Sequence, residues 1–108
     1  MSGQADKARR GAGGGKVRYR VEATESAEAD FERIPERDWR RIENDLRGLA
    51  ETPRPRNAVK IDGDIYRLRR GNWRVIYRIY DDRRYVLVGA ARRRNEKTYR
   101  GYEYLFPG

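Results

Sequence analysis

Apolar and charged residues alternate strictly near the start of the chain, in residues 17–22. Val17, Tyr19 and Val21 occupy every second position, and the residues between them are charged. Successive side chains of a strand point to opposite faces of a sheet, so this period of two is typical of a half-buried strand. The pattern therefore predicts a first β-strand over residues 17–22.

The alternation then gives way to helical spacing. Ala27, Phe31 and Ile34 recur at intervals of four and three residues, which places them on one face of a helix. Thr24 or Ser26 can cap the first turn, because a side-chain oxygen at that position accepts a backbone N–H of the turn. A first amphipathic helix is expected from Thr24 onward.

Pro35 begins a second helical stretch. It should end near Thr52, because the prolines at positions 53 and 55 cannot continue a helix. We expect the two helices to pack as an antiparallel pair with their apolar stripes in the core, since the chain holds little other apolar material. The stripe of the second helix consists of Trp39, Ile42, Leu46 and Leu49.

Residues 66–77 have the pattern of a β-hairpin whose two faces differ in chemistry. If Gly71 and Asn72 form its two-residue loop, Arg69 faces Arg74 across the strand pair. Like charges placed directly opposite each other destabilise a sheet, so this pairing predicts an anionic ligand, and planar guanidinium groups suit phosphate. One face carries Tyr66, Leu68, Val75 and Tyr77, and the other carries Arg67, Arg69, Arg74 and Arg78 together with Ile76.

Further strands are expected before and after the hairpin. Residues 58–62 can form a short strand that ends in a tight turn at 62–64, and a turn at Asp81 and Asp82 precedes an apolar strand at 85–89. The order β-α-α-β-β-β indicates an α+β fold. An antiparallel-rich sheet should pack on a helical hairpin, with the arginine-rich face left open.

The C-terminal segment, residues 90–108, combines a basic run with aromatic residues. Its aromatic side chains can either stack on unpaired bases or fold back over apolar surface. We favour folding back for the last three aromatic residues, Tyr102, Tyr104 and Phe106, together with Leu105, and treat Tyr99 separately.

The composition narrows the functions that are open to the chain. A length of 108 residues fits one domain, which we place at 17–108 after a flexible, glycine-rich basic arm at 1–16. The net charge of +9 points to nucleic acid, the ribosome or another acidic partner, and the alternative is a well-solvated basic surface without a ligand. No segment is apolar enough for a membrane span or a signal peptide, so we expect a cytoplasmic protein with no membrane partner.

The chain contains no Cys and no His. It therefore has no thiol nucleophile, no imidazole base and no usual zinc ligands, and we expect no cofactor. An enzyme built from this sequence would have to transfer protons through Tyr, Lys or carboxylate groups and stabilise anionic charge through Arg and Lys.

Several segments together resemble the RelE/ParE toxin superfamily. They are the prolines after the second helix, the sequence Lys60-Ile61-Asp62-Gly63, and Tyr66-Arg67-Leu68-Arg69 followed by Gly71-Asn72-Trp73-Arg74-Val75-Ile76-Tyr77. The resemblance covers roughly residues 17–99. It implies the toxin of a type II toxin–antitoxin system, with the RelE-like branch favoured.

The RelE-like branch cleaves mRNA in the ribosomal A site, whereas ParE-like members inhibit DNA gyrase. The resemblance implies attack of a ribose 2′-oxygen on the adjacent phosphate. It implies roles for Arg67 and Arg69 in binding phosphate, for Arg74 in stabilising the transition state, for Arg93 on the leaving-group side, and for Tyr99 in stacking or proton transfer. Arg92 or Arg94 could replace Arg93, because the preceding loop is slightly longer than usual.

The general base stays open at this point. Arginines have pKa values above 12 and can hardly serve as bases, so Tyr99 and Lys60 are the alternatives, and Lys60 is otherwise an ordinary exposed lysine. Lys60, Arg78, Arg92 and Arg94 are expected to contact RNA. The resemblance also implies a cognate antitoxin that forms a hetero-oligomer with the toxin, and mRNA and the ribosome as further partners. A ParE-like gyrase inhibitor and a non-catalytic RNA-binding module are the competing functions.

Overall fold

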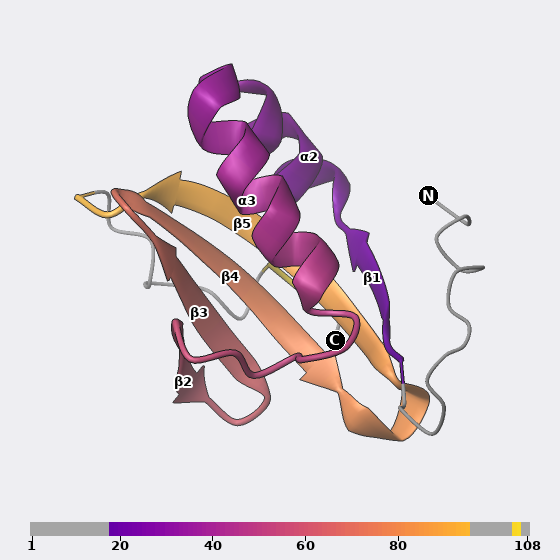
Figure 1. The fold of residues 1–108 in the computed structure, drawn as a ribbon. Helices are drawn as coiled ribbons and strands as arrows, with labels where there is room; N and C mark the ends of the chain where they lie inside the picture. Colours follow the sequence, from indigo (N-terminus) through magenta and orange to yellow (C-terminus); the bar gives the residue numbers. More distant parts are fainter. Residues whose placement is uncertain (1–17, 96–104, 107–108) are drawn as a thin grey trace.

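The computed structural model describes residues 18–95 and 105–106 of the chain, so the expected arm and Tyr99 lie outside the described residues. The sheet has the strand order β1-β5-β4-β3-β2; β1 pairs with β5 in parallel, and the other neighbours are antiparallel. Both helices lie on the same face of this sheet (Figure 1). The elements are β1 (Arg20–Ala23), α2 (Glu25–Glu32), α3 (Glu36–Gly48), β2 (Ala58–Asp62), β3 (Ile65–Arg70), β4 (Trp73–Tyr80), the short 3₁₀ helix η1 (Asp81–Arg83) and β5 (Tyr85–Arg93).

The α+β class is confirmed, and each segment expected to form a helix or a strand does so. The order is β-α-α-β-β-β-β, however, with one strand more after the helices than the expected β-α-α-β-β-β, because the hairpin supplies two strands between β2 and β5. The bounds of two strands differ clearly from the prediction. β1 begins at Arg20, three residues later than the alternation indicated, and β5 runs four residues beyond Gly89 to Arg93. No helix in the described part of the chain has the length and apolar character needed to cross a membrane.

The helix ends follow local hydrogen bonding. Thr24 caps α2, because its hydroxyl oxygen accepts the backbone N–H of Ala27 at 3.0 Å. α3 ends at Gly48 rather than near Thr52. The chain tightens there into bonds between residues three apart, such as that from the Leu49 N–H to the Leu46 carbonyl, before it reaches the prolines.

The hairpin register is the one that the sequence predicts. Arg70 pairs with Trp73, Arg69 with Arg74, and Leu68 with Val75. Gly71 has a φ of +59°, as the first loop position of a type II′ turn requires, and this conformation is readily available to glycine.

Hydrophobic cores lie on both faces of the sheet. The larger core packs the helices against Leu68, Val75 and Tyr77, as expected. The expectation of an open arginine-rich face is corrected, because a second core covers part of it. This core consists of Ile65, Ile76, Leu87, Ala90 and Phe106, with Ile61, Tyr80, Tyr85 and Leu105 packed against it. The prediction that Leu105 and Phe106 fold back over apolar surface is confirmed; Tyr102 and Tyr104 lie outside the described residues.

Candidate nucleic-acid interface

Three arginines form a row across the sheet, on the face away from the helices. Arg69 of β3 pairs with Arg74 of β4, and Arg74 pairs in turn with Arg92 of β5. Directly opposed residues of antiparallel strands point to the same side of a sheet, so the three side chains leave the sheet on one face. Alternation along β3 and β4 adds Arg67 and Arg78 to it. We call these five residues, Arg67, Arg69, Arg74, Arg78 and Arg92, the arginine face.

Arg74 is the most buried member of the arginine face, with 8% of its surface exposed. Its Nη1 donates to the carbonyl oxygens of Gly71 at 2.9 Å and Trp73 at 2.8 Å. These bonds hold the side chain in one orientation at the hairpin turn. A cation that is fixed before the ligand arrives loses little further freedom on binding.

The other members differ in exposure. Arg69 is exposed, whereas Arg67 and Arg78 are partly buried and their Nε atoms are out of contact with solvent. The guanidinium carbon of Arg78 lies 4.9 Å from the centre of the Tyr80 ring, which favours a cation–π contact. The arginine face thus contains one exposed cation, Arg69, and partly buried or buried arginines whose positions are set by packing.

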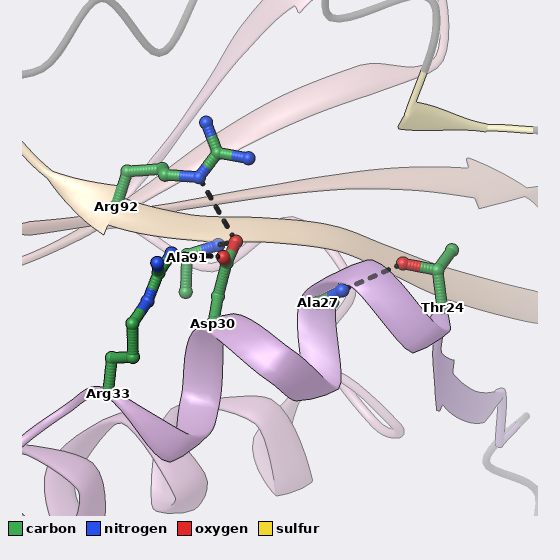
Figure 2. A network of polar contacts seen from close by, with 6 residues as sticks. All are labelled: Thr24, Ala27, Asp30, Arg33, Ala91 and Arg92. Carbon is green, nitrogen blue, oxygen red and sulfur yellow. Dashed lines mark hydrogen bonds and ion pairs between the residues drawn. The ribbon is translucent and has the colours of Figure 1, made fainter.

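Arg92 is held by a buried carboxylate that no sequence pattern had pointed to. Its Nε donates to Oδ2 of Asp30 in α2 at 3.1 Å, and the Asp30 side chain is 5% exposed. In the sequence, nothing distinguishes Asp30 from the other polar residues of the amphipathic helix. Only the packing of α2 against the end of β5 brings it to Arg92 (Figure 2).

Other residues expected at the site lie elsewhere. The structure does not bring Arg93 beside Arg74: Arg93 pairs with Trp73, and its guanidinium carbon lies 4.7 Å from the centre of that ring, on the helix side of the sheet. Lys60 pairs with Tyr66 and therefore also belongs to the helix side. Arg94 is exposed at the end of β5, where its backbone N–H donates to the Asn72 carbonyl at 2.7 Å.

A β-bulge explains why Arg92 replaces Arg93. Ile76 pairs with Ala90 but Tyr77 pairs with Val88, so Gly89 is an extra residue on β5. Unbroken alternation from Leu87 would have put Arg93 on the arginine face. One extra residue exchanges the two faces for the rest of the strand, which brings Arg92 there instead.

The hairpin turn also borders two small hollows. One, of about 180 Å³, lies between Arg41 of α3 and the turn, and the other, of about 260 Å³, lies beside Asn72 and Arg94; Arg93 lines both. Two polar side chains that line the smaller hollow already have partners: the Trp73 indole N–H donates to Asp38 at 3.0 Å, and Arg70 makes two bonds to Asp45. We place the candidate interface on the arginine face.

Proton-transfer groups are few on the arginine side of the described sheet. Tyr85 lies there, but its pKa is raised, chiefly by burial and then by the hydrogen bond that its hydroxyl donates to Glu22 at 3.0 Å. A raised pKa leaves less phenolate at neutral pH. The described residues contain no cluster of carboxylates that could hold a metal ion. The guanidinium groups of the arginine face have the chemistry to bind an anion and to stabilise its charge.

The family follows from the sequence itself. Residues 21–97 match the model of a family described as the ParE toxin of the type II toxin–antitoxin system parDE. The chain belongs to the ParE toxin family. That family lies within the RelE/ParE superfamily, as the sequence motifs indicated. No curated protein has a sequence significantly similar to that of this ParE-family toxin.

Solved structures resemble this toxin over most of their length. The RelBE2 toxin–antitoxin complex of Mycobacterium tuberculosis contains a chain that is 26% identical, with a TM-score of 0.64, over 74% of this chain and 95% of that one. The archaeal RelE–RelB complex of Pyrococcus horikoshii OT3 gives 25% identity and a TM-score of 0.64 over 72% and 97%. Isolated Escherichia coli RelE, at 18% identity and a TM-score of 0.64 over 74% and 88%, shares the fold.

Proposed function

We propose that this toxin binds mRNA on the ribosome through the arginine face and cleaves it in the A site. The observation that carries the proposal is the row of Arg69, Arg74 and Arg92 across three adjacent strands. Such a row places like charges on neighbouring strands, at a cost in stability that a bound phosphate backbone would offset. The net charge of +9 supports an RNA partner.

The proposed reaction is attack of a ribose 2′-oxygen on the adjacent phosphate, which breaks the bond from phosphorus to the 5′-oxygen and leaves a 2′,3′-cyclic phosphate end and a 5′-hydroxyl end. The 2′-hydroxyl loses its proton, and the departing 5′-oxygen gains one. Arg74 stabilises the charge that develops on the phosphate, because its guanidinium is already fixed by the Gly71 and Trp73 carbonyls. Arg92 takes the leaving-group side. Tyr99 is the proposed base, since Lys60 belongs to the opposite side of the sheet.

We also propose a cognate antitoxin as partner. The M. tuberculosis and P. horikoshii structures are both toxin–antitoxin complexes, and the likeness extends over nearly the whole of the matched chains. An antitoxin that covers the arginine face would block RNA and neutralise its charge. A toxin–antitoxin hetero-oligomer in the cytoplasm, where ribosomes are present, follows from this proposal.

A second function, inhibition of DNA gyrase, is favoured by the family match, which is to ParE toxins. The burial of Arg74 also fits it, because a guanidinium that binds two carbonyls of its own turn can serve the fold alone. Under this alternative the toxin performs no chemistry on RNA, and the arginine face binds a protein or DNA surface.

The test is cleavage of mRNA in a purified translation system, with the ends mapped by primer extension. We expect the unaltered toxin to produce 5′-hydroxyl ends within A-site codons. Arg74→Lys keeps the charge but loses the planar fork, so it should lower the cleavage rate about a hundred-fold, as the loss of a transition-state donor does. Arg69→Ala should weaken binding of the programmed ribosome.

The matched control is Arg40→Ala, which removes an exposed arginine of α3 whose side chain pairs only with Glu36 in the described structure. It should cleave as the unaltered toxin does. Intact message, together with accumulation of stalled gyrase cleavage complexes in a parallel supercoiling assay, would replace the proposed function with the gyrase alternative.

A further inference from the structure

β5 extends past the end of its parallel neighbour. The last pair between β1 and β5 is Ala23 with Val88, so from the bulge at Gly89 to Arg93 no strand of the described residues lies beside this edge of β5. An unpaired strand edge presents backbone N–H groups that need acceptors. Asp30 of α2 supplies one, because its Oδ2 accepts the backbone N–H of Ala91 at 3.0 Å.

The Asp30 carboxylate makes two further contacts from its buried position. Its Oδ1 accepts from Nη2 of Arg33 at 2.9 Å, and Oδ2 also accepts from Nε of Arg92 at 3.1 Å. A buried carboxylate is tolerated only when its oxygens are paired and hydrogen-bonded, and three donors meet this need. Figure 2 shows the carboxylate between the helix and the edge of β5, with both arginines directed toward it.

The contact with Arg92 leaves most of that guanidinium available. Asp30 binds only Nε, and the two terminal nitrogens point away from the carboxylate (Figure 2). The Arg92 side chain is 33% exposed, and its residue pairs with Arg74 on the sheet. A guanidinium whose Nε is fixed in this way can still present a fork of donors to a phosphate.

We propose that Asp30 is a positioning residue that holds Arg92 beside Arg74 on the arginine face. Its negative charge offsets the repulsion between these two cations, and its bond to Nε selects the side-chain orientation that directs the terminal nitrogens to the ligand. The proposal deepens the function proposed above and rests on it for its effect on RNA cleavage. The placement of Arg92 can be measured without cleavage.

Asp30→Asn is the informative variant, because an amide oxygen can still accept the Ala91 N–H while the charge is lost. In the purified translation system it should lower the cleavage rate by roughly ten- to a hundred-fold, the loss expected when a transition-state donor is misplaced. In a chain that already carries Arg92→Ala, Asp30→Asn should cause no further loss. A purely structural role would give the same loss in both backgrounds and would overturn the proposal.

Arg33→Gln is the matched control. It removes the other cation from Asp30 without touching Arg92, and it should leave cleavage close to that of the unaltered toxin. Thermal unfolding of each variant shows how much of any loss comes from a weakened fold. A loss in Arg33→Gln as large as that in Asp30→Asn would also overturn the assignment.

The second measurement is the NMR signal of the Arg92 Nε–H. We expect it to be protected from exchange with solvent in the unaltered chain and in Arg33→Gln, and to lose this protection in Asp30→Ala, which removes the accepting oxygen. Equal protection in Asp30→Ala would contradict the proposal. If the unaltered toxin cleaves no message, the proposed function fails, and this signal still decides whether Asp30 holds Arg92.

Discussion

Asp81 is the centre of a polar cluster at the other end of β4 from the hairpin turn. Its carboxylate accepts from the Tyr19 hydroxyl at 2.6 Å and from Nη2 of Arg54 at 2.7 Å. Nε of Arg54 donates in turn to the Tyr66 hydroxyl at 2.9 Å. These bonds connect the segment before β1, the loop after α3 and the sheet. Single residues of the cluster therefore hold together segments that are distant in sequence.

This cluster makes stability depend on pH in a defined direction. The bond from Arg54, and then that from Tyr19, lower the pKa of Asp81 below its usual 3.8. Because the folded-state pKa is depressed, the contribution of the carboxylate is present above about pH 4 and is lost as the pH falls through the folded-state value.

Asp81→Asn should therefore reduce the free energy of unfolding near neutral pH and have much less effect at about pH 2. The loss should be small, since the Asp81 side chain is 53% exposed and solvent screens its ion pair. Urea unfolding at the two pH values measures the difference. Asp82→Asn, in the same 3₁₀ turn, removes one charge without touching the Arg54 bonds, and an equal pH dependence there would refute the assignment.

At the scale of elements, the β3–β4 turn sets the register of the arginine face. Gly71 must adopt a φ of +59°, which for residues with a Cβ costs about 1–2 kcal/mol, so the turn and the pairing of Arg69 with Arg74 depend on a glycine.

Gly71→Ala should accordingly lower the free energy of unfolding by about 1 kcal/mol. Gly48→Ala, at the end of α3, is the control. At both Gly48 and Gly71 an added Cβ meets no described atom within 4 Å, but of these two glycines only Gly71 has a positive φ. Gly48→Ala should be neutral or slightly stabilising. Chemical denaturation of both variants checks this, and equal losses would show that backbone strain is not the cause.

At the scale of the whole molecule, the sheet carries a core on each face. Phe106 is 6% exposed and closes the second core, although it is far in sequence from the strands that it covers. A Cβ added to Gly89 would lie 2.9 Å from Cε1 of Phe106, so the bulge and this cover fit closely.

Phe106→Ala should destabilise the toxin by about 3 kcal/mol, since it removes a large side chain from a packed site. Val59→Ala is the comparison: Val59 is 42% exposed on β2, and its truncation should change stability by less than about 0.5 kcal/mol. Thermal and urea unfolding measure both. A change in Phe106→Ala as small as that in Val59→Ala would mean that the second core contributes little to folding.

Local patterns predicted most of the fold. The hairpin register around Gly71 and the capping of α2 by Thr24 follow from contacts between residues close in sequence. The end of α3 was predicted four residues too late, because the proline rule marks where a helix must stop and not where its hydrogen bonds begin to tighten. The arginine-rich face was expected to be open, and this was wrong for the part that the second core covers. Phe106 is distant in sequence from the strands it packs against, so no local pattern records the contact.

By itself, the sequence determined which segments form helices and strands, the two chemically distinct faces of the hairpin and the placement of Arg69, Arg74 and Arg78 on one of them. Periodicity is a local property, and it carries this information directly. Only the tertiary structure decided that Arg92, and not Arg93, lies beside Arg74, and that Asp30 holds it. A bulge and a helix-to-strand contact depend on packing between distant segments, which no local period records.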